Sequence, residues 1–521
     1  MDTTAPRFSV VTAVYDPPVA ALREMIDSVL AQSEPSWELV LVDDRSPDAA
    51  VRGVLEAAAR EDPRVRFTAR QENGGIVAAS NDAIDLARGE FLVFVDHDDL
   101  LTPDALARVA EELDAHPDAD YVYSDEDKIG PGGELYDVFR KPVWSPERLR
   151  GQMYTSHLSV MRTALVREVG ALRPGFDGSQ DHDLALRVTE RAREVRHIPE
   201  VLYHWRAVEG SAAAELDAKP YAWEAGRRAV DEHLQRSGLR ARAELGPFPG
   251  TYRVVRKPLG TPLVSIVIPT RGGSGLVWGD ERVFVVEAVR SVLRYAGYPR
   301  FEIVVVYDTP TPPAVLDELR RIGGDRVRLV EFDQPFNFSA KCNVGFLHSR
   351  GDVVVMLNDD TEVRSAEFLD RLIAPLDEED VAATGAHLSF EDGTLQHGGH
   401  IYFDGEMGHA WFGQSSDGGV GFSALAIARE VSGLTAACLA LRREVYEEVG
   451  GFTEALPGNF NDVDFSLKLR GTGRRLVWLP DVQAYHFESR TRVPTVHEWE
   501  IGAIRRRWDM PQVDPFLPGL S

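Results

Sequence analysis

The feature that most constrains this chain is an apolar strand that runs into a cluster of carboxylates and occurs twice. The first copy reads GEFLVFVDHDD from residue 89, and the second reads GDVVVMLNDD from residue 351. Aligned on their opening glycines, the copies place Asp96 over Asn358 and Asp98 over Asp360. A single copy is compatible with a strand that ends in a polar turn. Two copies in matching contexts favour a duplicated site at the edge of a sheet.

The segments around each copy predict an α/β fold. Apolar runs typical of buried strands alternate with runs that have the spacing of amphipathic helices, which indicates a mostly parallel, Rossmann-like sheet with helices on both faces. In the first half, the expected strands are residues 8–15, 37–42, 65–69 and 120–124, and the expected helices are residues 18–31, 49–60, 76–87 and 104–115. In the second half, the expected strands are residues 263–270, 301–306 and 327–332, and the expected helices are residues 284–296 and 317–322.

A repeat of this length indicates a duplicated domain rather than a solenoid array. An amphipathic helix at residues 221–235 and a stretch rich in proline and glycine at residues 246–262 lie between the copies. Such a stretch is typical of a linker. We therefore predict two tandem domains, residues 1–250 and residues 251–521.

The composition limits the classes of partner. The 521 residues carry a net charge of −26, which argues against nucleic-acid binding and against a polybasic membrane anchor. Cys342 and Cys438 are the only cysteines. No signal peptide is evident, and no apolar run reaches the roughly 18 residues of a membrane span, so we expect a cytoplasmic protein without disulfides. Any membrane contact is expected to be peripheral, on the inner face of the cytoplasmic membrane. The composition leaves the oligomeric state open.

Polar side chains follow the strands at one edge of each predicted sheet. In the first copy, Asp43 and Asp44 end one strand, and Asp96 and Asp98 follow another. Open α/β sheets bind ligands at the carboxyl ends of their strands, and hard oxygen ligands suit Mg²⁺ or Mn²⁺ bridging a diphosphate. The second copy has Asp308, Asn358, Asp359 and Asp360 at the same edge.

Two substitutions distinguish the copies. Tyr307 stands where the first copy has Asp43, so recognition of a base is expected to differ between the copies. Asn358 stands where the first copy has Asp96 and removes one formal charge. A neutral amide oxygen still coordinates a cation or accepts hydrogen bonds.

A second acidic motif lies near the end of each copy, at the head of a predicted helix. Asp181 belongs to GSQDHD and Asp462 belongs to NDVD. A lone carboxylate at this position is explained by helix capping. An aromatic–His pair follows in each copy, with His204 in the first and His486 in the second. A neutral imidazole there completes a metal site, or else the histidine is packed among aromatic side chains.

The order of these motifs resembles that of family 2 glycosyltransferases of the GT-A fold. The matching motifs are a strand ending in Asp-Asp, a helix opened by Asn-Gly-Gly, a strand ending in Asp-x-Asp, the late Asp-x-Asp and Tyr-His. The resemblance covers nearly the whole chain, twice. It is closest to bacterial tandem glycosyltransferases of O-antigen and cell-surface polysaccharide assembly.

The resemblance implies a role for each candidate residue. In the first copy, the donor-binding residues would be Asp43, Asp44 and Asp96, the metal ligands Asp98 and His204, and the general base Asp181. In the second copy, the donor-binding residues would be Asp308, Asn358 and Asp359, the metal ligands Asp360 and His486, and the general base Asp462.

The implied activity is inverting sugar transfer with Mn²⁺ or Mg²⁺ as cofactor and two active sites. The donor would be a UDP-, dTDP- or GDP-sugar, and the acceptor a glycan or lipid-linked glycan of a growing surface polysaccharide. A divalent metal stabilises the charge on the leaving diphosphate. One base within reach of the attacking hydroxyl is enough for direct displacement, whereas glycoside hydrolases place two carboxylates around the bond.

Two other functions are compatible with parts of the pattern. A sugar nucleotidyltransferase shares the acidic sheet edge but needs a Gly-rich loop with Arg or Lys after its first strand, which residues 15–18 and 270–273 do not supply. The substitutions in the second copy also fit one catalytic domain joined to a degenerate domain that only binds glycan.

Two further segments carry expectations of their own. The tract QHGGH at residues 396–400 has the composition of a metal site, although the resemblance favours a loop near the donor or acceptor. Residues 499–508 predict a terminal helix with three consecutive arginines and two tryptophans. Such a helix suits contact with anionic lipid, but packing on the second domain is the favoured interpretation.

Overall fold

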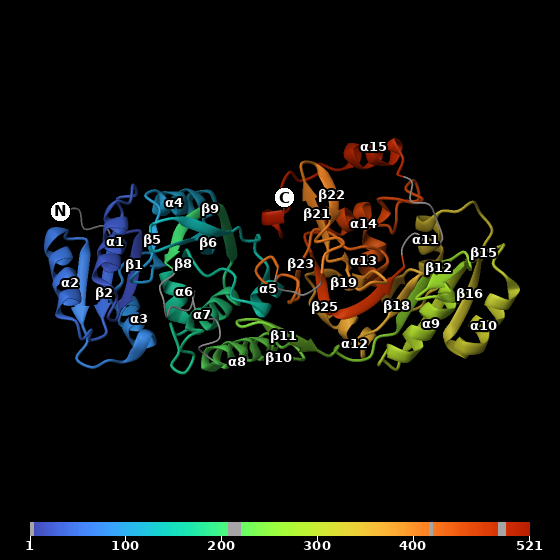
Figure 1. Cartoon of the computed structure of the whole chain (residues 1–521), viewed down its shortest axis with the longest axis horizontal. Helices are drawn as coiled ribbons and strands as arrows, with labels where there is room; N and C mark the ends of the chain where they lie inside the picture. The colour runs from blue at the N-terminus through green and yellow to red at the C-terminus, as the bar shows by residue number, and fades with distance from the viewer. Residues whose placement is uncertain (1–4, 207–219, 416–419, 488–495, 521) are drawn as a thin grey trace. The chain divides into compact units, whose positions relative to one another are not determined.

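The chain forms two compact units in the computed structural model (Figure 1). Unit 1 comprises residues 1–239 and 243–253, and unit 2 comprises residues 240–242 and 254–521. The structure describes residues 5–206, 220–415, 420–487 and 496–520. Each unit contains one large sheet with helices packed on it.

The sheet of unit 1 has nine strands in the order β3-β2-β1-β4-β8-β6-β9-β5, with β7 beside β6. The neighbours from β3 to β4 are parallel, whereas β8 runs antiparallel to β4 and β6. Every side chain of β2 is buried, as expected for a central parallel strand. The bounds are β1 (Phe8–Val14), β2 (Trp37–Asp43), β3 (Val65–Ala69), β4 (Phe91–Phe94), β5 (Leu100–Leu101), β6 (Ala119–Ile129), β7 (Leu135–Phe139), β8 (Ser159–Arg162) and β9 (Glu194–Arg206).

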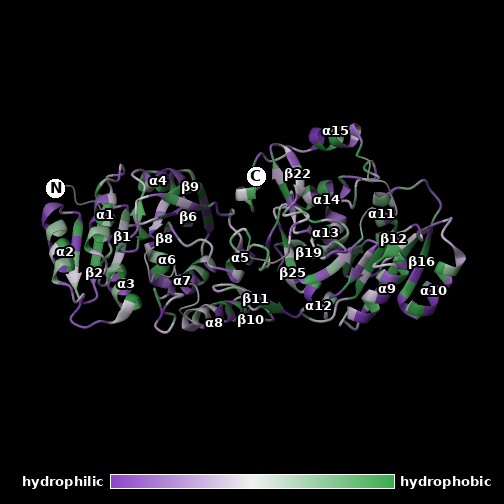
Figure 2. Ribbon diagram, viewed as in Figure 1, coloured by the Kyte–Doolittle hydropathy of each residue, from purple (hydrophilic) through white to green (hydrophobic). Residues whose placement is uncertain are grey.

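The helices of unit 1 bury one apolar face each. In α2, Asp48 caps the first turn by accepting a hydrogen bond from the Ala50 N–H at 2.8 Å, and Val51 and Leu55 face the core. Figure 2 shows the contrast between the hydrophobic strand β2 and the two-faced helix α2. The bounds are α1 (Val19–Leu30), α2 (Ala49–Glu61), α3 (Gly75–Leu86), α4 (Ala105–Ala115), α5 (Pro146–Gly151), α6 (Thr163–Glu168), α7 (Gln180–Thr189) and α8 (Pro220–Arg236); the hairpin of β10 (Ala241–Leu245) and β11 (Tyr252–Arg256) follows.

The sheet of unit 2 repeats the same order as β16-β15-β12-β17-β24-β19-β25-β18, with β20 beside β19 and β23 beside β25. The bounds are β12 (Val264–Thr270), β15 (Phe301–Asp308), β16 (Val327–Phe332), β17 (Val353–Leu357), β18 (Thr361–Val363), β19 (Val381–Ser389), β20 (Leu395–His397), β23 (Arg429–Glu430), β24 (Cys438–Arg442) and β25 (Arg475–His486). Two hairpins lie outside this sheet, β13 (Ser274–Val277) with β14 (Asp280–Val283) and β21 (His400–Phe403) with β22 (Glu406–His409).

The helices of unit 2 follow the order seen in unit 1. Their bounds are α9 (Phe284–Tyr295), α10 (Pro313–Gly323), α11 (Phe338–His348), α12 (Phe368–Ile373), α13 (Arg443–Glu448), α14 (Asn461–Arg470) and α15 (Glu498–Arg507), with 3₁₀ turns at Gly324–Arg326, Ala374–Asp377 and Pro518–Leu520. In the described residues, no helix combines the length and the hydrophobicity that a membrane crossing requires.

The registers align the two units residue by residue. Phe8 of β1 pairs with Phe91 of β4, and Val264 of β12 pairs with Val353 of β17, so residue 91 corresponds to residue 353. The predicted tandem α/β fold class is therefore confirmed, and both sheets are parallel only as far as β4 and β17 and mixed beyond them.

The terminal helix α15 packs on unit 2. Ile504 is buried with Val463 in one hydrophobic cluster. The indole N–H of Trp508 donates to Oδ1 of Asp464 at 2.8 Å, and the guanidinium of Arg507 lies 3.1 Å from the same oxygen. These contacts support the packing interpretation of residues 499–508.

Candidate active sites

The first acidic pair of unit 1 stands where β2 ends. Asp43 accepts a hydrogen bond from the Ser46 N–H at 2.9 Å. Asp44 accepts hydrogen bonds from the N–H groups of Gly74 and Gly75 at 2.9 and 2.7 Å, and Arg70 lies 3.1 Å away. Gly75 opens α3 with a φ of +79°, which glycine adopts without strain. Asp44 therefore holds the loop that starts α3, and both of its oxygens are occupied by protein groups.

The second acidic cluster of unit 1 follows β4. The side chain of Asp96 is 59% exposed, whereas that of Asp98 is mostly buried and Asp99 is fully buried. Asp99 accepts hydrogen bonds from the Tyr203 hydroxyl at 2.5 Å and the Arg206 N–H at 2.7 Å. Burial raises the pKa of Asp99 to about 8, and the charge of Asp96 adds to this effect. Burial also raises the pKa of Asp98.

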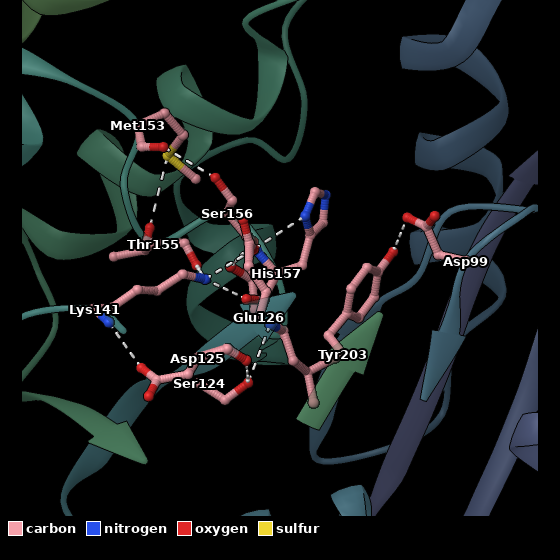
Figure 3. Close-up of polar contacts among 12 residues, drawn as sticks. Asp99, Ser124, Asp125, Glu126, Lys141, Met153, Thr155, Ser156, His157 and Tyr203 are labelled. Atoms are coloured by element: carbon pink, nitrogen blue, oxygen red, sulfur yellow. Dashed lines mark hydrogen bonds and ion pairs between the residues drawn. The ribbon is translucent and has the colours of Figure 1, made fainter. Parts of the chain in front are cut away.

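His157, from the loop before β8, lies beside Tyr203, whose hydroxyl donates to Asp99 of this cluster (Figure 3). Its ring stacks on Tyr203 with the centroids 4.6 Å apart, and single ligand atoms of His157, Asp96 and Asp99 all lie within 4.8 Å of one another. Burial tends to lower the pKa of His157. The carboxylate of Glu126, 3.3 Å from Nδ1, and the charges of Asp96 and Asp99 outweigh this effect and raise the pKa to about 9.

A buried ion pair holds Glu126 beside His157 (Figure 3). Nζ of Lys141 lies 2.9 Å from Oε2 of Glu126 and also donates to the carbonyl oxygens of Thr155 and His157. Lys141 is completely buried. Burial tends to raise the pKa of Glu126, but Lys141 and His157 outweigh it and lower this pKa to about 2.

His204, expected to share a metal with Asp98, lies on the other face of β9. Its Nδ1 is 2.5 Å from Oδ1 of Asp127, and no ion pair joins it to Asp98 among the residues that the structure describes. Its strand neighbours Tyr203 and Trp205 both contact His157. Because side chains alternate across a strand, His204 points away from the acidic cluster.

The helix-head carboxylate of unit 1 faces the cluster. Asp181 lies in the first turn of α7, while its neighbours His182 and Asp183 are buried and engaged, His182 with the Leu149 carbonyl oxygen and Asp183 with Arg187. Asp181 remains accessible to solvent. Desolvation raises the pKa of Asp181, the charge of Asp96 raises it further, and the charge of His157 opposes the shift. Because the charges of Asp96 and His157 act on Asp181, we assign the three side chains to one candidate site.

In unit 2, most of the expected residues line one cavity of about 600 Å³. His486 lines it, with Nε2 3.2 Å from Oδ1 of Asp360 and 3.3 Å from Nδ2 of Asn358. Asp359 accepts a hydrogen bond from the Thr270 hydroxyl at 2.6 Å. Burial raises the pKa of Asp359 to about 7, with a contribution from the charge of Asp360. The candidate residues in the lining are Asn358, Asp359, Asp360, Asp462 and His486.

Asp308 of unit 2 is held by cations. Nζ of Lys341 lies 2.7 Å from Oδ1 of Asp308 and donates to the Thr270 carbonyl oxygen at 2.6 Å. The guanidinium of Arg271 lies 3.5 Å from the other oxygen of Asp308. Lys341 lines the cavity and is 1% exposed, and burial lowers its pKa although Asp308 opposes this shift.

The two units supply their imidazole from different places, unit 1 from the loop before β8 and unit 2 from the end of β25. Phe94 pairs with Ser159, and Met356 pairs with Leu439, so residue 157 corresponds to residue 437, which is alanine. Leu101 pairs with Tyr203, and Val363 pairs with Ala484, so residue 486 corresponds to Trp205. His204 is therefore one residue out of register with His486. The imidazole beside the acidic cluster is His157 in unit 1 and His486 in unit 2.

Sequence reasoning missed His157 and the Glu126–Lys141 pair in unit 1. The motifs Tyr203-His204 and Tyr485-His486 look equivalent in the sequence, but the strand register shows that His204 corresponds to Tyr485. In unit 2, it left the role of His400 open, although His400 lines the cavity and its Nε2 lies 3.8 Å from Oδ2 of Asp462.

Both units thus place carboxylates at the carboxyl ends of parallel strands, with an aspartate at a nearby helix head, an arrangement typical of α/β proteins that bind their ligands at this edge of the sheet. Within that class, the chain belongs to glycosyl transferase family 2, whose family model matches residues 9–169 and 265–450. The two matched segments fall one in each unit.

Two relatives match most of this chain. It is 44% identical over 520 residues to the uncharacterized protein y4gI of Sinorhizobium fredii, and 36% identical over 523 residues to the O-antigen biosynthesis protein RfbC of Myxococcus xanthus. These alignments cover 96% and 98% of this chain but 56% and 40% of the relatives. The chain therefore spans about half the length of these curated relatives.

More distant similarities are shorter. Chondroitin synthase of Escherichia coli is 28% identical over 218 residues, which cover 41% of this chain and 31% of the synthase. Among solved structures, residues 1–349 of S. aureus TarS in complex with UDP-GlcNAc are similar with a TM-score of 0.36 and 22% identity, over 44% of this chain and 66% of that chain.

Proposed function

We propose that each unit is an inverting, metal-dependent glycosyltransferase with its own active site. The observation that carries this proposal is the cavity of unit 2, where Asn358, Asp359, Asp360 and His486 share one lining with Asp462. Its volume of about 600 Å³ lies in the range of small-molecule sites. Family membership supports sugar transfer, and the matching strand order of unit 1 supports a second site.

The residues of unit 2 fit a divalent cation. Asp360 and His486 offer an oxygen and a nitrogen 3.2 Å apart. Oδ1 of Asn358 is buried without a hydrogen-bond partner in the described residues, as expected for an atom that a cation would satisfy. Asn358, Asp360 and His486 would hold Mn²⁺ or Mg²⁺, and such an ion would supply positive charge to the diphosphate of the donor.

In unit 1, the corresponding carboxylates are Asp96 and Asp98, and His157 stands in place of the predicted His204. Because the pKa of His157 is about 9, its ring would release a proton on binding a cation. Asp96 is the exposed member, and its charge adds to the burial that raises the pKa of Asp98. A cation held here would offset the repulsion between the two carboxylates. Asp43 is better placed than Asp44 to meet the base, because both oxygens of Asp44 are occupied. In unit 2, Lys341 and Arg271 surround Asp308 and would recognise the donor differently.

Asp181 and Asp462 are the proposed general bases. Each lies in the first turn of a helix at the rim of its site. The base would take the proton of an acceptor hydroxyl while that oxygen attacks the anomeric carbon and the nucleotide leaves. Attack from the side opposite the leaving group inverts the anomeric centre. The raised pKa of Asp181 strengthens it as a proton acceptor.

The proposed donors are UDP-, dTDP- or GDP-sugars, and the proposed acceptor is a glycan or lipid-linked glycan of a bacterial surface polysaccharide.

We propose that the protein acts in the cytoplasm and meets the inner face of the cytoplasmic membrane peripherally at most. Because α15 packs on unit 2, replacing Arg505 and Arg506 by Glu should leave flotation with anionic vesicles unchanged. A loss of flotation would assign membrane contact to this helix.

The test is a panel of nucleotide sugars offered to the purified chain with primed oligosaccharide acceptors, read by product mass. We expect acceptor masses to increase by one sugar residue in the presence of Mn²⁺ or Mg²⁺, with inversion visible by NMR. Release of pyrophosphate from a sugar phosphate and a nucleoside triphosphate, without any glycan product, would instead identify a nucleotidyltransferase.

A further inference from the structure

Three histidines meet beside the unit 2 cavity, and two of them, His400 and His409, line it. His397 ends β20, His400 begins β21, and His409 ends β22. His400 and His409 are directly opposite partners of the hairpin. The three ring centroids lie 5.0 to 5.3 Å apart, with interplanar angles of 78° to 81°. No counterpart of this hairpin occurs in the part of unit 1 that the structure describes.

The nitrogens of this trio converge. One ligand nitrogen of each ring lies within 4.8 Å of the other two, and the Nδ1 atoms of His397 and His409 are 2.8 Å apart. His400 is 1% exposed, and neither of its ring nitrogens has a hydrogen-bond partner among the described residues. Because a buried imidazole without partners is costly, this arrangement indicates that a ligand completes the site.

We propose that His397, His400 and His409 bind one divalent transition-metal ion, for which Zn²⁺ is the best match. Three imidazoles with one open position form a typical zinc ligand set, and imidazole nitrogen favours such metals over Mg²⁺. The open position faces the cavity, where Oδ2 of Asp462 lies 3.8 Å from Nε2 of His400. This site is separate from the pair Asp360–His486, whose neighbouring oxygens suit Mn²⁺ or Mg²⁺.

Metal binding requires one proton to move. The Thr435 N–H donates to Nε2 of His397 at 3.2 Å, so the proton of this neutral ring is on Nδ1 and is shared with Nδ1 of His409. A metal on Nδ1 shifts this proton to Nε2, the ring stays neutral, and the Thr435 hydrogen bond is released. Two hydrogen bonds, from Thr435 to His397 and between His397 and His409, are exchanged for metal–nitrogen bonds at three rings.

A metal at this position would tie the hairpin β21–β22 to β20 beside the head of α14. The first turn of α14 carries Asp462, so the proposed base would face a wall of fixed geometry. The metal therefore acts as a structural element of the unit 2 acceptor site, for which unit 1 uses no equivalent hairpin in its described residues.

The experiment is a titration of the metal-stripped full chain with Zn²⁺, and with Co²⁺ as an optical probe. The wild type should bind one equivalent more than the His409→Ala variant, and the Co²⁺ complex should show the visible absorption of a nitrogen-ligated ion. Removal of one ligand should weaken the site by roughly 100-fold or more, since even outer partners of metal ligands contribute 10- to 100-fold.

Two variants serve as controls. His348→Ala removes an exposed histidine of the same unit that lies on α11 and should leave Zn²⁺ binding unchanged. Asp360→Asn should weaken the Mn²⁺ site but keep the nitrogen-ligated Co²⁺ spectrum, which separates this inference from the proposed activity. Equal Zn²⁺ stoichiometry and affinity in wild type and a folded His409→Ala variant would overturn the proposal. If that variant does not fold, the absence of a nitrogen-ligated Co²⁺ spectrum in the wild type would overturn it equally.

Discussion

The buried pair Lys341–Asp308 allows a quantitative prediction about unit 2. Replacing Lys341 by Met keeps the volume but leaves Asp308 buried without its partner at 2.7 Å. Breaking a buried ion pair from one side typically costs about 3–5 kcal/mol. Arg271 is 57% exposed and lies 3.5 Å from Asp308, so it can move closer and compensate in part. We therefore expect the lower end, a loss of about 3 kcal/mol in the free energy of unfolding of unit 2.

The matched control is Lys257, which pairs with Glu367 at the surface of the same unit with both side chains more than 40% exposed. Exposed pairs contribute about 0–1 kcal/mol, so Lys257→Met should be nearly neutral. The double variant Lys341→Met, Asp308→Asn should recover most of the loss, because replacing both partners removes the unpaired charge.

The assay is urea unfolding followed by circular dichroism, with the transition of unit 2 identified by its shift in the variants. Two units can unfold separately, so each transition is fitted on its own. If Lys341→Met and Lys257→Met cost the same, the buried pair does not stabilise unit 2 and the reasoning is refuted.

Three further predictions follow from the sites. His157→Ala should abolish sugar addition by unit 1, whereas His204→Ala should leave it within about tenfold, because a group outside the site contributes little to the roughly 10²–10⁴-fold effects of catalytic groups; equal losses in the two variants would restore His204 as the metal ligand. Asp360→Asn should raise the Mn²⁺ concentration that unit 2 needs for half-maximal rate, and a strong chelator should stop transfer; full activity in excess chelator would exclude the metal. Asp120 is buried, but hydrogen bonds from Arg193 and Arg162 outweigh the burial and lower its pKa from 3.8 to about 2. Ionised Asp120 should therefore contribute about 2 kcal/mol of stability above pH 4, and this contribution should be lost as the pH falls towards 2. The check is that Asp120→Asn destabilises unit 1 at pH 7 but not near pH 2.

Much of the fold was predictable, because buried parallel strands appear in the sequence as short, mostly apolar runs. Residues 37–42 and 301–306 are apolar except for Glu38 and Glu302, and the structure has β2 and β15 there. The predicted strand at residues 120–124 extends in the structure to Ile129 as β6. The sequence DEDK reads as a loop because four charges rarely enter a sheet.

The charges in β6 are tolerated because other parts of the chain neutralise them. Asp125 contacts His197 at 2.7 Å, Glu126 contacts Lys141, and Asp127 contacts His204. These partners lie far along the sequence, so no local pattern could predict them. The candidate site shows the same division between local and long-range information.

The acidic residues at strand ends were found because their position is fixed by the strand that precedes them. The histidines were harder, because a shift of one residue moves a side chain to the opposite face of a strand. For that reason His204 faces Asp127, and Trp205 corresponds to His486. The pattern TSHLS at residues 155–159 could have indicated His157, because it places an imidazole just before β8, which pairs with the strand β4 that leads into the acidic cluster.

The central claim is that the chain carries two separable active sites, and the most direct test is the product mass made by Asp181→Asn and Asp462→Asn. Asparagine keeps the shape of the side chain but accepts no proton at neutral pH, so each variant should lose its own sugar addition by roughly 10²–10⁴-fold. On primed acceptors, with each donor offered singly and both together, the other addition should continue at the wild-type rate. Loss of both additions in either variant would contradict independent sites, and an unchanged product pattern in Asp462→Asn would reduce unit 2 to glycan binding.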